Sequence, residues 1–177
     1  GVVFNTIVTS NFAKAICEKY HLELVQTLTG FKYIGEQAAL LENTDKEFFF
    51  GYEESYGYVI KDFVRDKDSF QASLLLAEVA SYYKEQGKTL IQVLNDLFKE
   101  FGYYLEGVHN IGLAGIEGAN RIQKIMHYFQ DTKLTDIAGR HIQTFEDYDK
   151  LVKVENDKMS ALTLPRSFVL KYIFDDG

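Results

Sequence analysis

Two short polar segments contain residue types that could bind a small polar ligand. The first, Thr27–Lys32, reads TLTGFK, and the second, Gly51–Gly57, reads GYEESYG. In the second segment Glu53, Glu54 and Ser55 offer oxygen acceptors suited to the several donor hydroxyls of a sugar. Glycines bracket this acidic pair, so the loop can turn sharply and bring its backbone close to a ligand. The alternative is an ordinary loop whose acidic side chains point into water.

Two lysines near expected helix starts are candidates for contacts with an anion or a sugar oxygen. Lys32 follows Thr29 and Gly30 where a helix should begin, and free N–H groups at a helix N-terminus favour anions. Lys67 belongs to the string RDKD, which directly precedes another expected helix. The alternatives are an exposed Lys32 and, for RDKD, a salt-bridged helix entry with Asp68 as the N-cap.

Other kinds of catalytic or metal site lack their motifs. The sequence around Ser55 does not fit the G-x-S-x-G of hydrolases, and Gly112, Gly115 and Gly118 do not form the G-x-G-x-x-G of dinucleotide sites. The four histidines are scattered, and the pair Asp66 and Asp68 is too small a ligand set to predict a metal site. We therefore expect no cofactor or metal bound by this chain.

The composition of the chain excludes some classes of binding partner and favours one cellular compartment. The chain has 177 residues with 26 acidic and 19 basic side chains, and no basic cluster, so we expect no nucleic-acid partner. No apolar stretch approaches the roughly 18 residues of a membrane span, so we expect a soluble protein without a membrane partner. Cys17 is the single cysteine and cannot form an internal disulfide, which favours the cytoplasm.

The elements expected in the first half of the chain alternate between strand and helix. Strands are predicted at Val2–Val8, Leu22–Val25 and Glu47–Gly51, with helices beginning near Phe12 and running through Ile34–Leu41. This order predicts the α/β class, with a mainly parallel sheet and flanking helices. In such a sheet ligands bind beyond the carboxyl ends of the strands, so both polar loops should lie at one edge.

Two further helices and a change of pattern follow. Helices are predicted from Asp68 to Gly87, with Phe70, Leu74 and Ala77 facing the core, and from Thr89 to Gly102, each with a capping-box pattern. Beyond this point the sequence predicts a partial α+β unit with one helix and a long polar loop. Its predicted elements are a strand near Tyr104–Ile111, a helix carrying Ile122, Ile125, Met126 and Phe129, a strand at Arg140–Phe145, the loop Asp147–Pro165, and a strand at Phe168–Phe174.

We predict two domains, residues 1–104 and residues 105–177. The sequence ends at Asp175–Gly177, a turn signal that normally connects two strands, so the second unit is expected to be cut short. A chain of this length is long enough for one ordinary domain and part of another.

Three strings in order, TLTGFKYIGE, FFFGYEESYGY and FVRDKDSFQASLLLAE, resemble the third domain of phosphoglucomutases and phosphomannomutases. The resemblance is continuous from Val2 to about Tyr104. From about Leu105 onward, the chain resembles the connector and the opening of the fourth domain in this family, including LPRSFVLKYIFDDG. The phenylalanine at position 31 departs from phosphomannomutases that have a histidine in this loop, and TGFK with EESYG looks closer to the branch of phosphoglucomutases and phosphopentomutases.

The resemblance implies a role for each candidate residue. Glu53 and Ser55 would accept hydrogen bonds from sugar hydroxyls, while Glu54 would support the loop. Thr29, Gly30 and Lys32 would line the sugar pocket. Lys67 matches a family lysine proposed to assist proton transfer, which makes it the catalytic candidate.

The implied activity is that of an intramolecular phosphotransferase which interconverts hexose 1-phosphate and hexose 6-phosphate. In the complete enzymes a phosphoserine and a Mg²⁺ site lie on earlier domains, and a loop of the fourth domain binds the substrate phosphate. This chain lacks those parts, so we expect it to be inactive alone and to need a hexose phosphate and the remaining domains as partners. A phosphopentomutase, a sugar-bisphosphate synthase and a stand-alone sugar-binding module remain alternatives.

Overall fold

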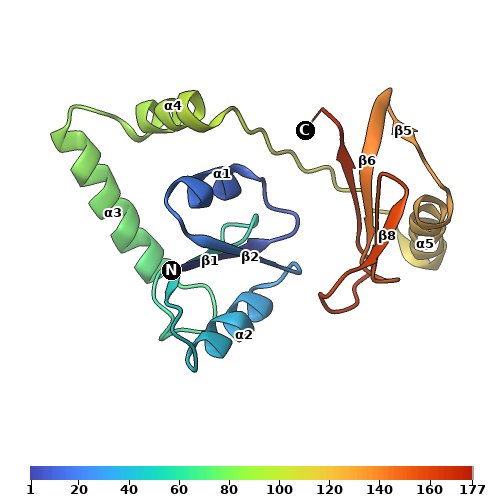
Figure 1. Cartoon of the computed structure of the whole chain (residues 1–177), viewed down its shortest axis with the longest axis horizontal. Coiled ribbons are helices and arrows are strands. Elements are labelled where there is room, and N and C mark those ends of the chain that lie inside the picture. The colour runs from blue at the N-terminus through green and yellow to red at the C-terminus, as the bar shows by residue number, and fades with distance from the viewer. Residues whose placement is uncertain (177) are drawn as a thin grey trace. The chain divides into compact units, whose positions relative to one another are not determined.

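The computed structural model describes residues 1–176 and divides the chain into two compact units, Gly1–Gly107 and Val108–Gly177. Each unit has its own sheet, the first with parallel pairings and the second entirely antiparallel. Helices flank the sheet of the first unit (Figure 1). The predicted class, a mainly parallel α/β unit followed by an α+β unit, is confirmed.

The first sheet has four strands in the order β2-β1-β3-β4. The strands are β1 (Val2–Thr6), β2 (Glu23–Thr27), β3 (Phe48–Tyr52) and β4 (Tyr58–Val59). β1 pairs in parallel with both β2 and β3, whereas β4 returns antiparallel to β3. The short strand β4 is absent from the sequence predictions, because two residues are too few to show an alternating pattern.

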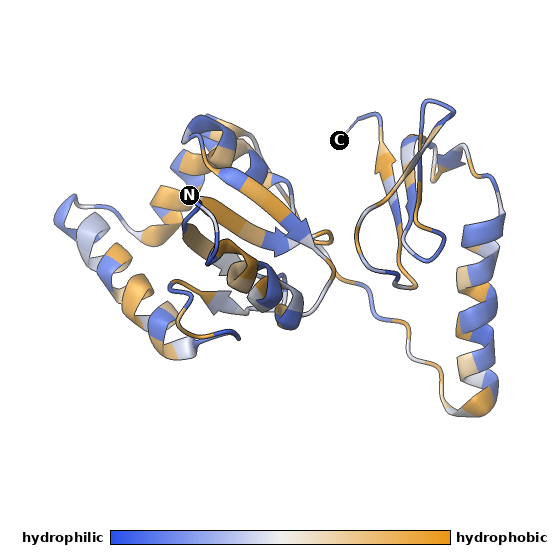
Figure 2. Ribbon diagram, turned by 60° about the horizontal axis from the view of Figure 1, so that its bottom comes forward, coloured by the Kyte–Doolittle hydropathy of each residue, from blue (hydrophilic) through white to orange (hydrophobic). Residues whose placement is uncertain are grey.

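Helices α1 (Phe12–Lys19) and α2 (Phe31–Leu41) connect the three parallel strands and lie on opposite faces of the sheet (Figure 1). The core on the α2 side is a cluster of buried apolar side chains from β1, α2, β3 and β4, and Figure 2 shows these strands as largely hydrophobic. Its members are Val2, Phe4, Phe31, Ile34, Ala38, Phe48 and Val59. Burial of these side chains stabilises the sheet and fixes the start of α2.

The loop before α3 packs closely against α2. A Cβ on Gly35 would lie 2.2 Å from the carbonyl oxygen of Arg65, so the backbone of the RDKD string touches α2 where this glycine leaves room. The Arg65 guanidinium pairs with Glu42 at the end of the same helix. This contact fixes the position of Lys67, two residues further along the chain.

Helix α3 (Ser69–Glu85) begins where the sequence predicts, but the face that it buries is not the predicted one. Asp68 is its N-cap and accepts hydrogen bonds from the backbone N–H groups of Phe70 and Gln71. The Gln71 side chain does not complete a capping box, because its carbonyl oxygen accepts from Ile60 N at 3.0 Å and thereby joins α3 to the end of β4. The predicted core stripe is wrong, since Phe70 is 87% exposed and Leu74 is 64% exposed.

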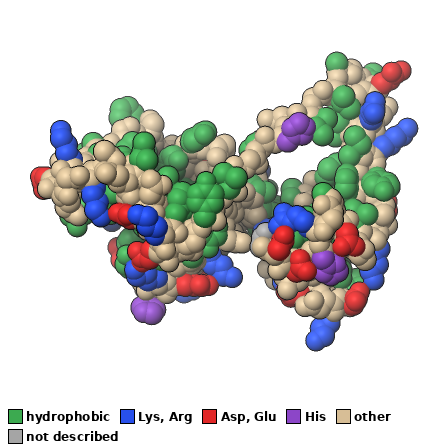
Figure 3. Space-filling view, turned by 90° about the horizontal axis from the view of Figure 1, so that it is seen from above, with side chains coloured by type: hydrophobic (Ala, Val, Ile, Leu, Met, Phe, Trp, Pro, Cys, Tyr) green, Lys and Arg blue, Asp and Glu red, His purple; other side chains and the backbone are tan. Residues whose placement is uncertain are grey.

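The inner face of α3 contains Ala72, Leu75 and Val79, which line a hollow of about 380 Å³ together with Phe50 and Tyr58. The apolar residues of α3 surround most of the helix, so periodicity alone could not choose between two apolar faces. Several hydrophobic side chains are exposed on the first unit as a result, as Figure 3 shows.

Helix α4 (Leu90–Phe101) follows the sequence prediction closely. Thr89 and Gln92 form both hydrogen bonds of a capping box, and Gly102 with φ 98° ends the helix. Phe12 of α1 stacks near Phe98 and Tyr104, with ring centroids 5.4 Å and 5.1 Å apart. These aromatic contacts hold α4 and the following segment on α1.

The predicted strand near Tyr104–Ile111 is wrong, because this segment has no regular structure and pairs with no strand among residues 1–176. Its apolar residues Val108 and Ile111 are exposed. A strand needs a neighbour for its backbone hydrogen bonds, and neither unit offers one here.

The second unit combines one helix with five antiparallel strands. The elements are α5 (Gly115–Asp131), β5 (Asp136–Ile137), β6 (Arg140–Asp147), β7 (Val152–Glu155), β8 (Lys158–Ala161) and β9 (Leu170–Phe174). The sheet runs β5-β6-β7-β8, and β9 also pairs with β6. Tyr172 of β9 stacks on Phe145 and donates its hydroxyl to the carbonyl of Phe129 at 2.7 Å, which attaches α5 to the sheet.

The predicted long loop Asp147–Pro165 is wrong, because it contains the hairpin of β7 and β8. Asn156 and Asp157 form its two-residue turn, with φ of 48° and 61°. Positive φ at both positions matches the twist of a tight hairpin, and Asn and Asp tolerate this conformation. Because the whole segment is polar, Asn156 and Asp157 did not stand out in the sequence as a turn between two strands.

Candidate sugar-binding site

The two polar loops follow β2 and β3, and both of these strands run parallel to β1. The carboxyl ends of parallel strands meet at one edge of a sheet, so the loops Leu28–Gly30 and Glu53–Gly57 both leave the sheet at the edge where β1 ends in Thr6. This arrangement is the one predicted from the β-α-β order of the sequence. It brings buried polar side chains of β1 next to the acidic loop.

Glu53 is the buried acidic residue of the site, with 7% of its surface exposed. Its backbone N–H donates to the carbonyl of Gly57 at 3.0 Å, which closes the loop, and Tyr56 takes φ 62° at the tip. The Glu53 side chain lies directly against Gly57: a Cβ added to that glycine would lie only 2.5 Å from Glu53 Oε1. The loop therefore depends on a residue without a side chain at position 57.

Lys67 supplies the cation nearest to this carboxylate. Its Nζ lies 3.8 Å from Glu53 Oε1 and 3.6 Å from Asp66 Oδ1. The same ammonium lies 5.8 Å from the centre of the Phe31 ring, at the start of α2. A buried carboxylate needs a compensating charge or hydrogen bond, and Lys67 provides the charge while remaining exposed to a ligand.

Glu54 is held from the side of β1. Its Oε2 accepts a hydrogen bond from the hydroxyl of Thr6 at 2.6 Å. The Thr6 hydroxyl also lies 2.9 Å from that of Thr9, and the backbone N–H of Thr6 donates to Thr9 Oγ1 at 3.2 Å. The two carboxylates of the loop thus have different surroundings, one beside Lys67 and one beside a pair of threonines.

A second polar contact crosses all three parallel strands. Gln26 of β2 donates to Asn5 Oδ1 of β1, and Asn5 Nδ2 donates to the hydroxyl of Tyr52 at the end of β3, both at 3.2 Å. Burial raises the pKa of Tyr52 above its ordinary 10, while the hydrogen bond from Asn5 opposes this effect. Tyr52 is therefore a neutral phenol where the acidic loop begins.

The other predicted site residues lie at the same edge but are more exposed. Thr29 and Ser55 are exposed, so their hydroxyls are open to a ligand, and Gly30 is the N-cap of α2 with φ 121°. Lys32 is also exposed, and its Nζ lies over the ring of its neighbour Tyr33, 4.8 Å from the centroid. The structure thus joins Glu53 to Lys67 directly, whereas Lys32 packs on its own helix.

Asn5, Thr6, Thr9 and Gln26 are absent from the sequence predictions for the site. Asn5 and Thr6 are completely buried in a strand that otherwise reads as apolar. A polar pair at the carboxyl end of a buried parallel strand is the signal that could have identified them, because buried polar groups need partners.

Among residues 1–176, no group of three or more histidine, cysteine, aspartate or glutamate side chains is placed to hold a metal ion. None of the helices in this range is long and apolar enough to cross a membrane.

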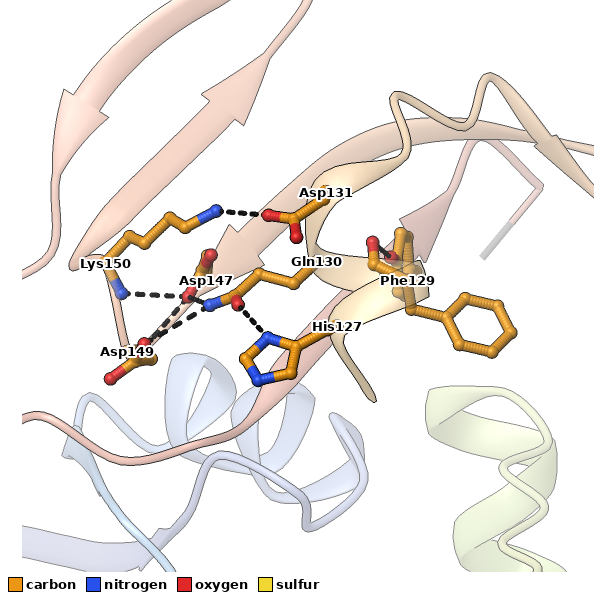
Figure 4. A network of polar contacts seen from close by, with 8 residues as sticks. His127, Phe129, Gln130, Asp131, Asp147, Asp149 and Lys150 are labelled. Atoms are coloured by element: carbon orange, nitrogen blue, oxygen red, sulfur yellow. Dashed lines mark hydrogen bonds and ion pairs between the residues drawn. The ribbon is translucent and has the colours of Figure 1, made fainter. Parts of the chain in front are cut away.

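The second unit contains its own buried polar network (Figure 4). Asp147 Oδ1 accepts from Gln130 Nε2 at 3.2 Å and from the backbone N–H groups of Asp149 and Lys150 at 3.0 and 2.9 Å. Lys150 Nζ donates to Asp131 at 2.9 Å, which lowers the pKa of that carboxyl. These contacts attach the turn after β6 to the end of α5, so we assign them a structural role.

Comparison with known proteins identifies relatives along the whole chain. Residues 1–101 match the family described as phosphoglucomutase/phosphomannomutase, alpha/beta/alpha domain III. A phosphoglucomutase of Staphylococcus epidermidis is 33% identical over 99% of this chain and 32% of that protein, and one of Staphylococcus haemolyticus is 33% identical over 100% and 32%. The chain therefore spans about a third of the length of the curated relatives it matches.

A solved structure supports the fold. The open form of pp63/parafusin, a phosphoglucomutase from Paramecium, aligns with all of this chain and 29% of its own, at a TM-score of 0.57 and 18% identity. At this identity the likeness concerns the architecture alone.

Proposed function

Because the chain belongs to the phosphoglucomutase/phosphomannomutase family, we propose that it is the sugar-recognition part of a mutase which interconverts hexose 1-phosphate and hexose 6-phosphate, with glucose as the sugar. The single observation that carries this proposal is the buried Glu53 carboxylate, which lies 3.8 Å from Lys67 at the edge where both polar loops emerge. An ordinary solvated loop would leave its acidic side chains in water.

In this proposal the two acidic residues have separate tasks. Glu53 accepts hydrogen bonds from ring hydroxyls together with Ser55, whose hydroxyl is exposed beside it. Glu54 supports the loop through Thr6. Thr29 and Gly30 bound the pocket from the neighbouring loop, and the ammonium of Lys32 binds a substrate oxygen after leaving the ring of Tyr33.

Lys67 is the proposed catalytic residue. Lys67 is exposed, and its Nζ lies 3.8 Å from the Glu53 carboxylate, so a hydroxyl bound to Glu53 would lie within reach of the ammonium. A cation at that position stabilises the negative charge that develops on the reacting hydroxyl oxygen in the transition state. Lys67 therefore acts in the chemical step, whereas Glu53 orients the sugar.

The remaining chemistry belongs to other parts of a full-length enzyme. We propose that the phosphoserine, the Mg²⁺ site and the phosphate-binding loop lie outside this chain, and that the isolated chain has no mutase activity. Phosphoryl transfer depends on positioning and charge stabilisation, so a part without these groups binds the sugar but does not turn it over. We place the enzyme in the cytoplasm.

The test is Glu53→Gln in the full-length enzyme. A hydrogen bond to an ionised acceptor is worth about 1.5–3 kcal/mol, so kcat/KM should fall by about tenfold to a few hundredfold. The thermal midpoint should change little, because glutamine has nearly the same shape. Unchanged kcat/KM would remove Glu53 from the site and refute the proposal.

A further inference from the structure

We infer that Thr6 and Thr9 are positioning residues, which hold the Glu54 carboxylate and thereby fix the acidic loop in one orientation for sugar binding. This inference rests on the proposed function for its catalytic consequence. The contact itself stands on the structure alone: Thr6 Oγ1 lies 2.6 Å from Glu54 Oε2, across 48 residues of sequence.

The direction of each hydrogen bond follows from the chemistry of the partners. An ionised carboxylate only accepts, so the single hydroxyl proton of Thr6 is directed to Glu54. Thr9 must then donate its own hydroxyl proton to Thr6 Oγ1, 2.9 Å away, while its oxygen accepts from the backbone N–H of Thr6. The two threonines thus form a continuous chain of donors that ends on the carboxylate, and each bond polarises the next.

The location of Thr6 makes it a rigid point of attachment. It is completely buried and is the last residue of β1, the strand that pairs on one side with β2 and on the other with β3. Thr9 is 8% exposed, and its N–H donates back to the carbonyl of Thr6 at 3.1 Å. A loop fixed to this point cannot shift without breaking a charge-assisted hydrogen bond.

Thr27 shows that these contacts are not a general property of threonines at this edge. It is the last residue of β2, is 3% exposed, and is the direct neighbour of Thr6 across the parallel pair. Its hydroxyl donates to the backbone carbonyl of Leu28 at 3.0 Å. A weaker hydrogen bond runs from the same hydroxyl to the carbonyl of Asn5 at 3.4 Å. Thr27 is therefore a matched control with the same residue type, burial and strand position, whose hydroxyl donates to backbone carbonyls instead of to Glu54.

The experiment compares Thr6→Val, Thr9→Val, Thr6→Ser and the control Thr27→Val. In the 177-residue chain, the amide NMR signals of Glu53–Gly57 should move in the first two variants, and stay near wild type in Thr6→Ser and Thr27→Val. In the full-length enzyme, kcat/KM for glucose 1-phosphate should fall about tenfold in Thr6→Val and recover in Thr6→Ser, because a hydrogen bond to a charged group is among the stronger kinds.

The outcomes separate this inference from the proposed function. If Thr6→Val and Thr9→Val move the loop signals no more than Thr27→Val does, the threonines do not hold Glu54 and the inference is refuted. If the signals move but kcat/KM stays normal in a protein where Glu53→Gln is impaired, the positioning role is refuted while sugar recognition stands. An unimpaired Glu53→Gln would instead count against the proposed function. Should Thr6→Val fail to fold, Thr9→Val decides by the same criteria.

Discussion

Replacement of Gly57 by alanine tests the geometry of the acidic loop most directly. The new Cβ would lie 2.5 Å from Glu53 Oε1, 2.8 Å from its Cγ and 2.9 Å from its Cδ. Ordinary contact begins at 3.4 Å, so the carboxylate must retreat by about 0.9 Å, the difference between 3.4 and 2.5 Å. All three nearest atoms belong to one flexible side chain, so Glu53 should move while the backbone stays.

A displacement of this size has a large kinetic consequence if Glu53 orients the substrate. Misplacement by about 1 Å can cost about a hundredfold in rate, so we expect kcat/KM of the full-length Gly57→Ala enzyme to fall by about ten- to a hundredfold. The thermal midpoint should remain close to wild type, because Gly57 does not have the positive φ that an alanine resists.

The control is Gly107→Ala, since a Cβ there meets nothing within 4 Å and φ is also not positive. Both kcat/KM and the thermal midpoint should be measured for the two variants in parallel. If Gly57→Ala keeps the activity of Gly107→Ala, the position of the Glu53 carboxylate does not matter for catalysis and our reasoning about the loop is wrong.

Three further predictions concern stability and charge. Gly35→Ala should destabilise the protein by about 1–3 kcal/mol in denaturant unfolding, because its Cβ would meet the Arg65 carbonyl at 2.2 Å; a normal midpoint would show that the loop before α3 yields freely. Gln130→Leu should cost about 1–3 kcal/mol by removing a donor to Asp147 inside the second unit, whereas Gln123→Leu on the exposed side of α5 should be nearly neutral; equal effects would contradict a structural role for this network. The carboxyl of Asp131 should titrate below its ordinary pKa of 3.8 by NMR and return towards it in Lys150→Met, so that this ion pair stabilises the fold above pH 3.8 and is lost as the pH falls through the lowered pKa; an unchanged titration in Lys150→Met would refute the pairing.

Local sequence signals predicted the structure correctly where the interacting groups lie within a few residues of one another. Thr89 and Gln92 form a capping box within four residues, and Asp68 caps α3 with its own side chain. The alternation of strands and helices likewise predicted a parallel sheet, because right-handed connections between alternating strands and helices leave few other topologies. The central position of β1, between β2 and β3, comes from the structure alone.

Signals failed where the outcome depends on a distant neighbour. The segment Tyr104–Ile111 has residues typical of a strand, but no strand among residues 1–176 lies beside it. In α3, Phe70 and Leu74 are exposed because a different apolar face of the helix packs on the sheet. In both cases propensity and periodicity indicate which structures and buried faces a segment can adopt, whereas the neighbouring elements determine which of them forms.

For the candidate site, the sequence by itself predicted two polar loops as the ligand-binding segments and predicted that the parallel strands place both loops at one edge of the sheet, which is where the structure has them. Only the tertiary structure decided which acidic residue is buried beside Lys67, since Glu53 and Glu54 are adjacent and chemically identical in sequence. It also revealed Thr6 as the partner of Glu54, because that contact joins residues 48 positions apart through the end of β1. Hydrogen bonds of this kind depend on how strands meet in space, and no local pattern along the chain encodes them.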